Sequence, residues 1–416
     1  MRSKKLSIES IAILAIFSAI LFTIGTRAAA QKEKVLHNFN SADGAYPSGN
    51  LIFDSAGNLY GTVSGGGVDY SGRAYELTPV DGVWKEEVLA DLGPQNSRPC
   101  PCSGLTLGAG GSLYGMTYNG GADGYGSVFE LTAKTGGGWA ESGLRSFYDR
   151  GQPSGGGYYP NGGVTINAAG NIYGTTNAGG ASNYGTVFEL IRNADGTGTE
   201  QVLHSFDPNS GGDGSEPAGG VILDASGNVY GTTAVGGAYS AGTVFKLTPV
   251  AGGVWAEQAL HSFGSGSDGA YPYATLTFDS FGNLYGTTTG GGGGHGAGTV
   301  FELSPGEGGV WNEKVVHTFE EGTADGQTPY APVVIDVEGN LYGTTTLGGV
   351  YGYGVAFELK PASGGDWTEA VLHNFGHGID GQNPSGGLVF DLEGNLYGAT
   401  ALGGTEGDGT VFEIKP

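Results

Sequence analysis

The sequence has few basic residues, with 17 Lys and Arg against 41 Asp and Glu in 416 residues. Each contact with a nucleic-acid phosphate or an anionic lipid needs a basic side chain, so both are poor candidates as partners. Sustained 3.6-residue apolar periodicity is missing after the first 30 residues, which argues against helices. The sequence also lacks a pair of catalytic acids, a nucleophile elbow and an H-E-x-x-H metal motif. It therefore favours an acidic all-β protein that carries no familiar catalytic signature.

Cysteine is almost absent, and its two copies, Cys100 and Cys102, stand together in the segment RPCPC. Two cysteines in an exported chain favour a disulfide, although a bridge between residues i and i+2 is strained and therefore reducible. A free or redox-active pair and a metal site are the alternatives, the metal being the weakest because two ligands make a poor cage. We therefore predict a local disulfide and no metal site.

The one long apolar run lies at the N-terminus, between a basic start and three alanines at 28–30. This pattern predicts a secretory signal peptide over residues 1–30, because an apolar run of 14 residues is short for a membrane span. An uncleaved anchor is the alternative. The predicted signal peptide holds four basic residues and one acidic one, so residues 31–416 carry a formal charge of −27. We expect them to be secreted, to the extracellular space or the periplasm, without attachment to a membrane.

A long repeat dominates these remaining residues. GNLYG or a near variant recurs seven times, with its Tyr 54 to 59 residues apart: Tyr60, Tyr114, Tyr173, Tyr230, Tyr285, Tyr342 and Tyr397. Each unit carries four strand-like runs, which in the fifth unit span 274–279, 283–288, 298–303 and 311–319, with turn signals such as D-x-x-G-N between them. Seven such units predict a seven-bladed β-propeller that forms one domain over residues 31–416. An open β-solenoid is the alternative, although solenoid repeats are shorter.

The two ends of the repeat region test for ring closure. After the signal peptide the chain begins with QKEKVLHNF, the fourth run of a unit, and it ends with GTVFEIKP, the third run. The last blade is therefore expected to take its outermost strand from the N-terminus, which pairs the two terminal edges.

The units GNLYGTT-x-GG and GTVFEL resemble the GloVer tandem-repeat family of exported bacterial proteins, which is named partly for its choice of C-terminal anchors. The resemblance covers nearly all of residues 34–416. Because this sequence ends in a repeat strand with no sorting tail, the resemblance implies a freely secreted or periplasmic form. It implies no molecular function.

If the fourth run is outermost, two sets of loops open on one face of the ring, where a rigid scaffold usually carries its site. The first set reads D-G-x-x-P in five units and presents Asp43, Asp213, Asp268, Asp325 and Asp380. Asp-Gly is turn chemistry, so we interpret these aspartates as turn residues. A Ca²⁺ site made from them is the alternative, and otherwise we expect no cofactor.

The second set of loops connects the second run to the third and carries Tyr70, Tyr125, Tyr184, Tyr239, His295, Tyr351 and Tyr353. Tyrosine rings at loop tips suit sugar rings or partner proteins, and packing over neighbouring loops is the alternative. The glycine run before His295 contains G-x-G-x-x-G, but a strand pattern follows it where a phosphate loop needs a helix. Units two and three break the repeat and add Arg98, Arg150, Tyr158 and Tyr159 to the same face.

The fourth run carries Glu in all seven units (Glu33, Glu86, Glu141, Glu200, Glu257, Glu313, Glu369) and His in five (His37, His204, His261, His317, His373). Glu and His on one strand face would suit metal or acid–base chemistry. A catalyst, however, needs one asymmetric group of residues, so we interpret the repeated pair as a packing device.

The sequence therefore favours a non-catalytic, monomeric binding or structural propeller that holds a glycan or an extracellular protein through the loops of one face. The alternative is an extracellular propeller hydrolase or lyase that acts on sugars or lactones with a metal at the channel mouth. This alternative rests only on analogy with other propellers.

Overall fold

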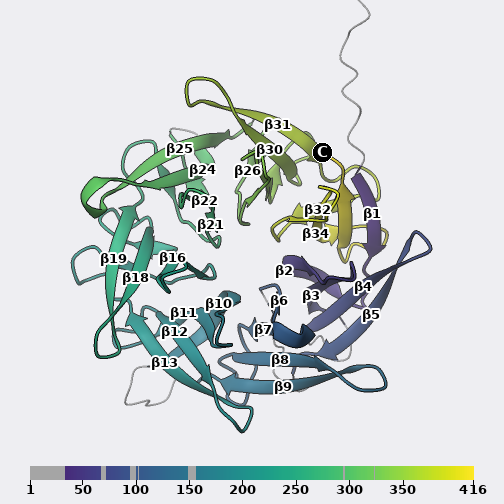
Figure 1. Ribbon diagram of the computed structural model, residues 1–416. Coiled ribbons are helices and arrows are strands. Elements are labelled where there is room, and N and C mark those ends of the chain that lie inside the picture. Colours follow the sequence, from purple (N-terminus) through teal and green to yellow (C-terminus); the bar gives the residue numbers. More distant parts are fainter. Residues whose placement is uncertain are drawn as a thin grey trace, which may run out of the picture. The chain divides into compact units, whose positions relative to one another are not determined.

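The computed structural model describes residues 33–66, 72–93, 100–101, 103–148, 156–293, 296–322 and 324–416. The compact unit Glu33–Pro416 is a ring of seven antiparallel sheets, a seven-bladed β-propeller (Figure 1). Its described residues form strands and turns, with two short 3-10 turns at Ala109–Gly111 and Glu307–Gly309. No helix in these ranges has the length and apolar character to span a membrane. The predicted signal peptide lies outside the described residues.

Each blade has four strands, and the blades are numbered one to seven along the chain. The innermost strands are β2 (Ala45–Phe53), β6 (Thr106–Leu107), β10 (Gly157–Ile166), β15 (Ile222–Leu223), β21 (Thr277–Phe278), β27 (Val334–Ile335) and β33 (Val389–Phe390). The second strands are β3 (Leu59–Gly65), β7 (Leu113–Thr117), β11 (Ile172–Gly179), β16 (Val229–Thr233), β22 (Leu284–Thr288), β28 (Leu341–Thr345) and β34 (Leu396–Gly403). The third strands are β4 (Arg73–Val80), β8 (Ser127–Ala133), β12 (Thr186–Arg192), β18 (Thr243–Val250), β24 (Gly296–Pro305), β30 (Val355–Pro361) and β35 (Thr410–Ile414). The outer strands are β5 (Val83–Asp91), β9 (Trp139–Ser146), β13 (Gly198–Ser205), β19 (Val254–Ser262), β25 (Trp311–Glu320), β31 (Trp367–Asn374) and β1 (Glu33–Asn38).

Several innermost strands are shorter than the sequence predicts. In blade five only Thr277 and Phe278 pair regularly with the second strand, whereas the pattern predicts a run over 274–279. The preceding residues turn toward the neighbouring blade, where the Gly220 N–H donates a hydrogen bond to Thr275 Oγ1. Farther from the axis the same segments pair again as short ladders, which are β14 (Gly214–Ser215) with β17 (Val235–Gly236), β20 (Gly269–Ala270) with β23 (Gly290–Gly291), β26 (Gly326–Gln327) with β29 (Leu347–Gly348), and β32 (Gly381–Pro384) with β34.

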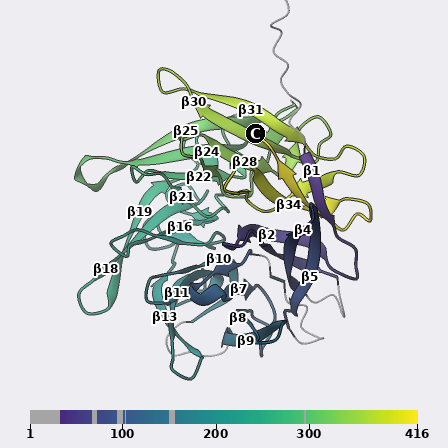
Figure 2. The same cartoon turned by 45° about the vertical axis from the view of Figure 1, so that its right-hand side comes forward.

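The ring closes as predicted. The N-terminal strand β1 pairs antiparallel with β35 and so supplies the outer strand of blade seven, with Glu33 opposite Ile414 and Val35 opposite Phe412. Two views of the ring show the C-terminus beside β1 (Figures 1 and 2). The C-terminal strand β35 is therefore paired on both sides and is not left as an open sheet edge.

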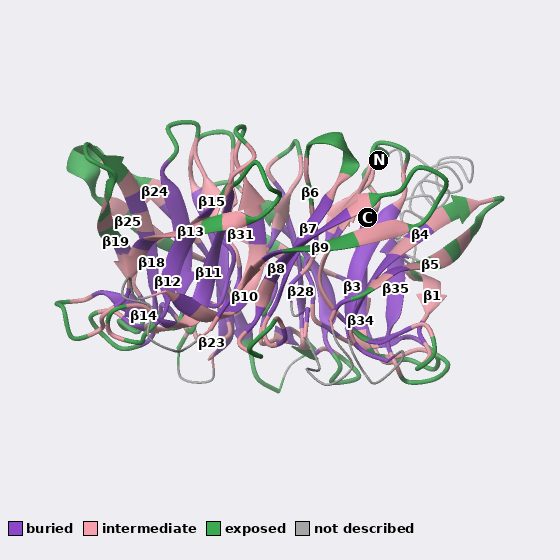
Figure 3. Ribbon diagram, turned by 90° about the horizontal axis from the view of Figure 1, so that it is seen from below, coloured by how far each residue is buried: buried purple, intermediate pink, exposed green. Residues whose placement is uncertain are grey.

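The hydrophobic core lies between blades. Each outer strand ends near an aromatic or leucine side chain that packs on the third strand of the following blade. The aromatic pairs have ring centroids 4.9 to 5.4 Å apart: Phe39–Tyr75, Phe147–Phe188, Phe206–Phe245, Phe263–Phe301, Phe319–Phe357 and Phe375–Phe412. Burial follows this plan, with buried strands inside the ring and exposed hairpin tips on both faces (Figure 3). Burying one such ring contributes about 1.5–3 kcal/mol.

Two glycines of each repeat are required by this packing. A Cβ on Gly286 of the second strand would lie 2.5 Å from the Phe301 ring. Gly242, just before the third strand of blade four, has φ of +100°, and its Cβ would lie 2.6 Å from Pro272 Cδ of blade five. The glycine content therefore reflects close contact between strands and between blades.

Candidate functional site

Two sets of loops meet on one face of the ring, which we call the loop face. The aspartate loops lead from an outer strand to the next blade, and the glycine loops connect second to third strands. In six blades, the residue before the proline of the aspartate loop donates its N–H to a glycine-loop carbonyl of the preceding blade, at 2.8 to 2.9 Å. These pairs are Tyr46–Asp408, Tyr159–Tyr125, Glu216–Tyr184, Tyr271–Ala241, Thr328–Ala297 and Asn383–Tyr353. The predicted common face is thereby confirmed, and β14 and β23 lie at its rim, at the bottom of Figure 3.

The pre-proline residues of these six loops share an uncommon backbone. All six have φ between +55° and +62° although none is glycine: Tyr46, Tyr159, Glu216, Tyr271, Thr328 and Asn383. A non-glycine residue in this region costs about 1–3 kcal/mol and persists only where the surroundings fix it. Here the hydrogen bond to the preceding blade fixes it and turns the side chain outward, so that Tyr46 is 46% and Tyr271 44% exposed. Tyr46 and Tyr271 were not among the residues predicted from the sequence.

The tyrosines predicted for the glycine loops fall into two groups. Tyr184, Tyr239, Tyr351 and Tyr353 are exposed, with Tyr239 the most accessible at 57%. Tyr125 instead gathers between blades two and three with Tyr158 and Tyr159, which were predicted for the expanded first loop of unit three, and Tyr159 also stacks on Tyr118 with centroids 5.0 Å apart. The second group shows the packing over neighbouring loops that was the alternative interpretation. A ligand-binding role for either group stays a prediction.

Five of the predicted site residues lie outside the described ranges: Tyr70, Arg98, Cys102, Arg150 and His295. Cys100 is described, and its N–H donates a 3.0 Å hydrogen bond to Asn119 Oδ1. Its sulfur is not a free thiol. Because Cys102 lies outside the described ranges, the geometry of the predicted pair stays a prediction.

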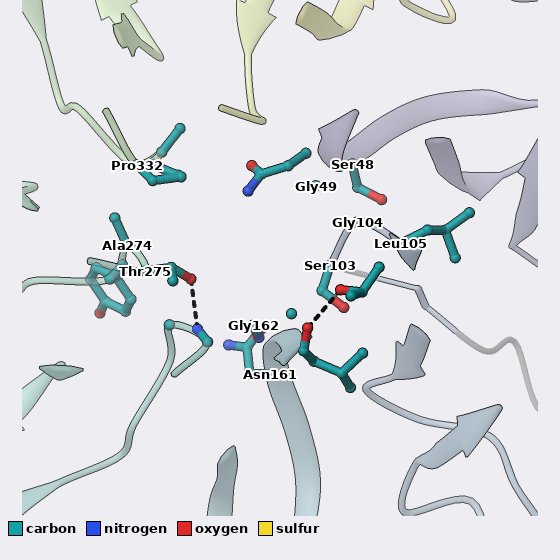
Figure 4. Close-up of a pocket in the computed structure, with 18 of the residues that line it drawn as sticks. Ser48, Gly49, Ser103, Gly104, Leu105, Asn161, Gly162, Ala274, Thr275 and Pro332 are labelled. Atoms are coloured by element: carbon teal, nitrogen blue, oxygen red, sulfur yellow. Dashed lines mark hydrogen bonds between the residues drawn. The ribbon is translucent and has the colours of Figure 1, made fainter. Parts of the chain in front are cut away.

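The mouth of the central channel forms a cavity of about 470 Å³ (Figure 4). Small side chains and glycine backbone line it, and hydrogen bonds between blades hold its wall, such as the 2.6 Å bond from Thr106 Oγ1 to the Val164 carbonyl. Its described lining contains no carboxylate, imidazole, amine, guanidinium or thiol. The titratable groups in this lining are Tyr273 and Tyr330, whose rings stack with centroids 5.3 Å apart. Burial and the neighbouring Tyr273 raise the pKa of Tyr330.

Away from the channel, the contact between the outer parts of two consecutive blades forms a polar seam. Five seams contain a His from one outer strand, an Asp from the following aspartate loop and a Glu from the next outer strand. The Nε2–Oδ2 distances are His37–Asp43 3.5 Å, His204–Asp213 3.1 Å, His261–Asp268 3.1 Å, His317–Asp325 3.4 Å and His373–Asp380 2.8 Å. The aspartates also accept turn N–H groups, as the turn interpretation predicts, for example Gly264 N to Asp268 Oδ1 at 2.9 Å. The His–Asp contacts were not predicted from the sequence.

The seam glutamates are electrostatically unusual. Burial, with the nearby Asp carboxylate second, raises the pKa of Glu33, Glu86, Glu313 and Glu369 to about 7. One carboxylate oxygen of each is buried and has no hydrogen-bond partner among the described residues. The seam between blades two and three differs, because Arg145 replaces the His and forms a 2.7 Å ion pair with Glu200. These repeated groups thus form polar contacts between blades as well as packing there.

The repeat itself identifies the family. The family model described as the Gloeobacter/Verrucomicrobia repeat matches residues 19–157, 140–331 and 221–416. This chain belongs to that family. The GloVer resemblance is confirmed, and in this member of the Gloeobacter/Verrucomicrobia repeat family the repeated units build the blades of a propeller.

Comparison with characterised proteins adds the fold alone. No curated protein matches this member of the Gloeobacter/Verrucomicrobia repeat family. One similar solved structure is an ulvan lyase, a polysaccharide lyase bound to -[GlcA(1-4)Rha3S]-, with 11% identity over 92% of this chain and 95% of that chain and a TM-score of 0.52. Another is a protein of unknown function from Dyadobacter fermentans DSM 18053, with 12% identity over 92% of this chain and 98% of that chain and a TM-score of 0.42.

Proposed function

We propose that this propeller is a non-catalytic binding protein that holds an uncharged glycan on its loop face. The observation that carries this proposal is the set of six backbone hydrogen bonds that clamp the pre-proline residues to the glycine loops of preceding blades. They bring side chains from different blades to one surface and hold them in a fixed, strained conformation. A binding surface fixed in this way loses little conformational entropy when a ligand arrives.

Tyrosine supplies the chemistry on this surface. Tyr46 and Tyr271 come from the aspartate loops, and Tyr184, Tyr239 and Tyr351 from the glycine loops, each with 37% to 57% of its surface exposed. A tyrosine ring offers an apolar face to the C–H groups of a sugar and a hydroxyl for its polar edge. Repetition around the ring suits a polymer that presents similar sugar units at several points.

Charge favours a neutral ligand over an anionic one. The described arginines are all committed to ion pairs, which are Arg73–Asp91, Arg145–Glu200 and Arg192–Glu130. The loop face also includes the acidic residues Glu216 and Asp408, and the sequence as a whole has a formal charge of −24. The ulvan lyase of similar fold binds the saccharide -[GlcA(1-4)Rha3S]-, which supports testing glycans first.

The channel supports binding over catalysis. A hydrolase or lyase with a metal at the channel mouth needs carboxylate, imidazole or thiolate ligands, and the described lining presents none. An acid–base pair there would have to be built from Tyr273 and Tyr330 alone. The hydrolase or lyase alternative therefore has less support than the binding protein.

Affinity electrophoresis in gels containing uncharged polysaccharides tests the proposal, together with a neutral-glycan array. Each exposed ring is expected to contribute about 0.5–1.5 kcal/mol, so Y46A/Y271A should weaken binding by roughly tenfold or more. Phe281 is 85% exposed in a hairpin on the opposite face, so F281A is the matched control and should bind as the parent does. Binding restricted to anionic glycans, or equal binding by Y46A/Y271A and the parent, would contradict the proposal.

A further inference from the structure

The seam between blades five and six brings three metal-ligating side chains together. His317 lies on the outer strand β25 of blade five, Asp325 on the aspartate loop that follows it, and Glu369 on the outer strand β31 of blade six. One ligand atom from each lies within 4.8 Å of the other two. None of the three belongs to the loop-face tyrosines or to the channel.

Two atoms of this group are buried without a hydrogen-bond partner. His317 Nε2 lies 3.4 Å from Asp325 Oδ2, but neither it nor Glu369 Oε1 makes a hydrogen bond within the described structure. Buried polar atoms are almost always bonded, so two such atoms pointing to one spot indicate a missing partner. Asp325 is already oriented, because its Oδ1 accepts the Gly326 N–H at 2.7 Å.

At three other seams the histidine is satisfied, although a glutamate oxygen without a partner recurs there. His204, His261 and His373 make direct hydrogen bonds to their aspartates, at 3.1, 3.1 and 2.8 Å. Glu33, His373 and Asp380 also lie within 4.8 Å of one another, but an ion there would have to break the short His373–Asp380 bond.

Two further seams differ from seam five–six because an arginine lies beside their glutamate. Between blades seven and one, the buried guanidinium of Arg73 acts on Glu86. Between blades two and three, Arg145 pairs with Glu200. His37 Nε2 and Glu86 Oε1 between blades seven and one are also unsatisfied, but Arg73 acts on that glutamate. Seam five–six is therefore the described seam that combines an unsatisfied His and Glu with no arginine beside them.

The donor set and spacing suit a transition metal. One imidazole nitrogen and two carboxylate oxygens are zinc ligands, with bonds of about 2.0–2.2 Å. Two ligands of a tetrahedral ion with such bonds lie about 3.3 Å apart, close to the 3.4 Å between His317 Nε2 and Asp325 Oδ2. Water would fill the fourth position.

We propose that His317, Asp325 and Glu369 bind one divalent transition-metal ion of the zinc type. The ion balances the two carboxylates, satisfies the two buried atoms and links the outer strand of blade five to blade six. The site is structural and independent of the proposed glycan surface.

Titration calorimetry with ZnCl₂ on the untagged full-length protein, after EDTA treatment and dialysis, tests the site. We expect one ion per chain and an affinity at least about tenfold weaker in H317Q and in E369Q, because losing a ligand costs more than losing a supporting contact. E313Q is the matched control, since Glu313 occupies the same strand position at the seam where His261 already bonds Asp268, and it should bind Zn²⁺ as the parent does.

The position of the ion can be measured in the parent protein, without any variant. Zinc-edge anomalous diffraction from parent crystals soaked in ZnCl₂ should place one peak between β25 and β31. No calorimetric binding, equal affinity in parent, H317Q and E369Q, or a peak elsewhere with none at this seam would overturn the proposal. If H317Q or E369Q fails to fold, judged by circular dichroism, the anomalous peak alone decides.

Discussion

Removing the charge of one seam glutamate is expected to stabilise the protein. Glu313 reaches from β25 into the seam between blades four and five, and its Oε1 is buried with no hydrogen-bond partner in the described structure. Burial first, and the Asp268 carboxylate second, raise its pKa from 4.5 to about 7. The substitution Glu313→Gln keeps the shape of the side chain and abolishes its ionisation.

The size and sign of the effect follow from linkage. A shift of 2.5 pKa units, from 4.5 to about 7, corresponds to about 3.4 kcal/mol, and solvent around a half-buried side chain reduces this to about 1–2 kcal/mol. Between pH 4.5 and 7 the folded protein holds a proton on Glu313 that the unfolded chain has lost, so its stability falls as the pH rises through this window. E313Q should therefore match the parent near pH 4.5 and exceed its free energy of unfolding by about 1–2 kcal/mol at pH 8.

Guanidinium unfolding at pH 4.5, 6 and 8, in EDTA, measures this difference. Glu200→Gln is the matched control of opposite sign, because Glu200 holds the same strand position but forms an ion pair with Arg145. E200Q leaves the guanidinium without its partner and should lower stability at pH 8. A constant difference between E313Q and parent at all three pH values, or a lower stability of E313Q at pH 8, would refute the electrostatic reasoning.

Three further predictions concern packing and backbone. Phe263→Ala removes a fully buried ring that packs on Phe301, and unfolding should show a loss of about 3–5 kcal/mol. Gly242→Ala places a Cβ 2.6 Å from Pro272 at a φ of +100°, so its thermal midpoint should fall well below that of the parent, by a loss of at least about 2 kcal/mol; an unchanged midpoint would contradict the close-contact role. Thr328→Asn relieves a β-branched residue at a φ of +57° and should raise stability by about 0.5–1 kcal/mol, whereas a lower midpoint would show that the threonine is not strained.

The architecture could be predicted because each strand is determined by its own short segment of sequence, and the same segments recur in every blade. Alternation within a run such as GTVFEL reports a strand whether or not the neighbouring blade is present. The fourth run at the N-terminus and the third at the C-terminus together specified the β1–β35 pairing, which the structure contains. The short innermost strands could not be predicted, because their residues leave the ladder to bond the neighbouring blade, as Thr275 does with Gly220.

The contacts at the seams and on the loop face join residues of different blades, so the sequence of a single strand does not reveal them. His261 and Glu257 share a strand face, yet His261 bonds Asp268 of the next loop, while residues four apart on a strand are about 13 Å apart. Contact there depends on how blades stack around an axis, which strand periodicity does not report. The pre-proline positions were missed for another reason: a residue before proline is expected to be extended, and clamping to the preceding blade overrides that preference.

The pairing of β1 with β35 also imposes an order of events on folding. The ribosome makes β1 before the other described strands of the ring, while its partner β35 is the last of them. Until β35 has been made, β1 has no partner strand and blade seven stays incomplete. Contacts between such distant segments form slowly, so closure is expected to be the late step of folding. In a circular permutant that joins the present termini and opens the chain between two other blades, β1 would follow β35 directly and could pair with it at once.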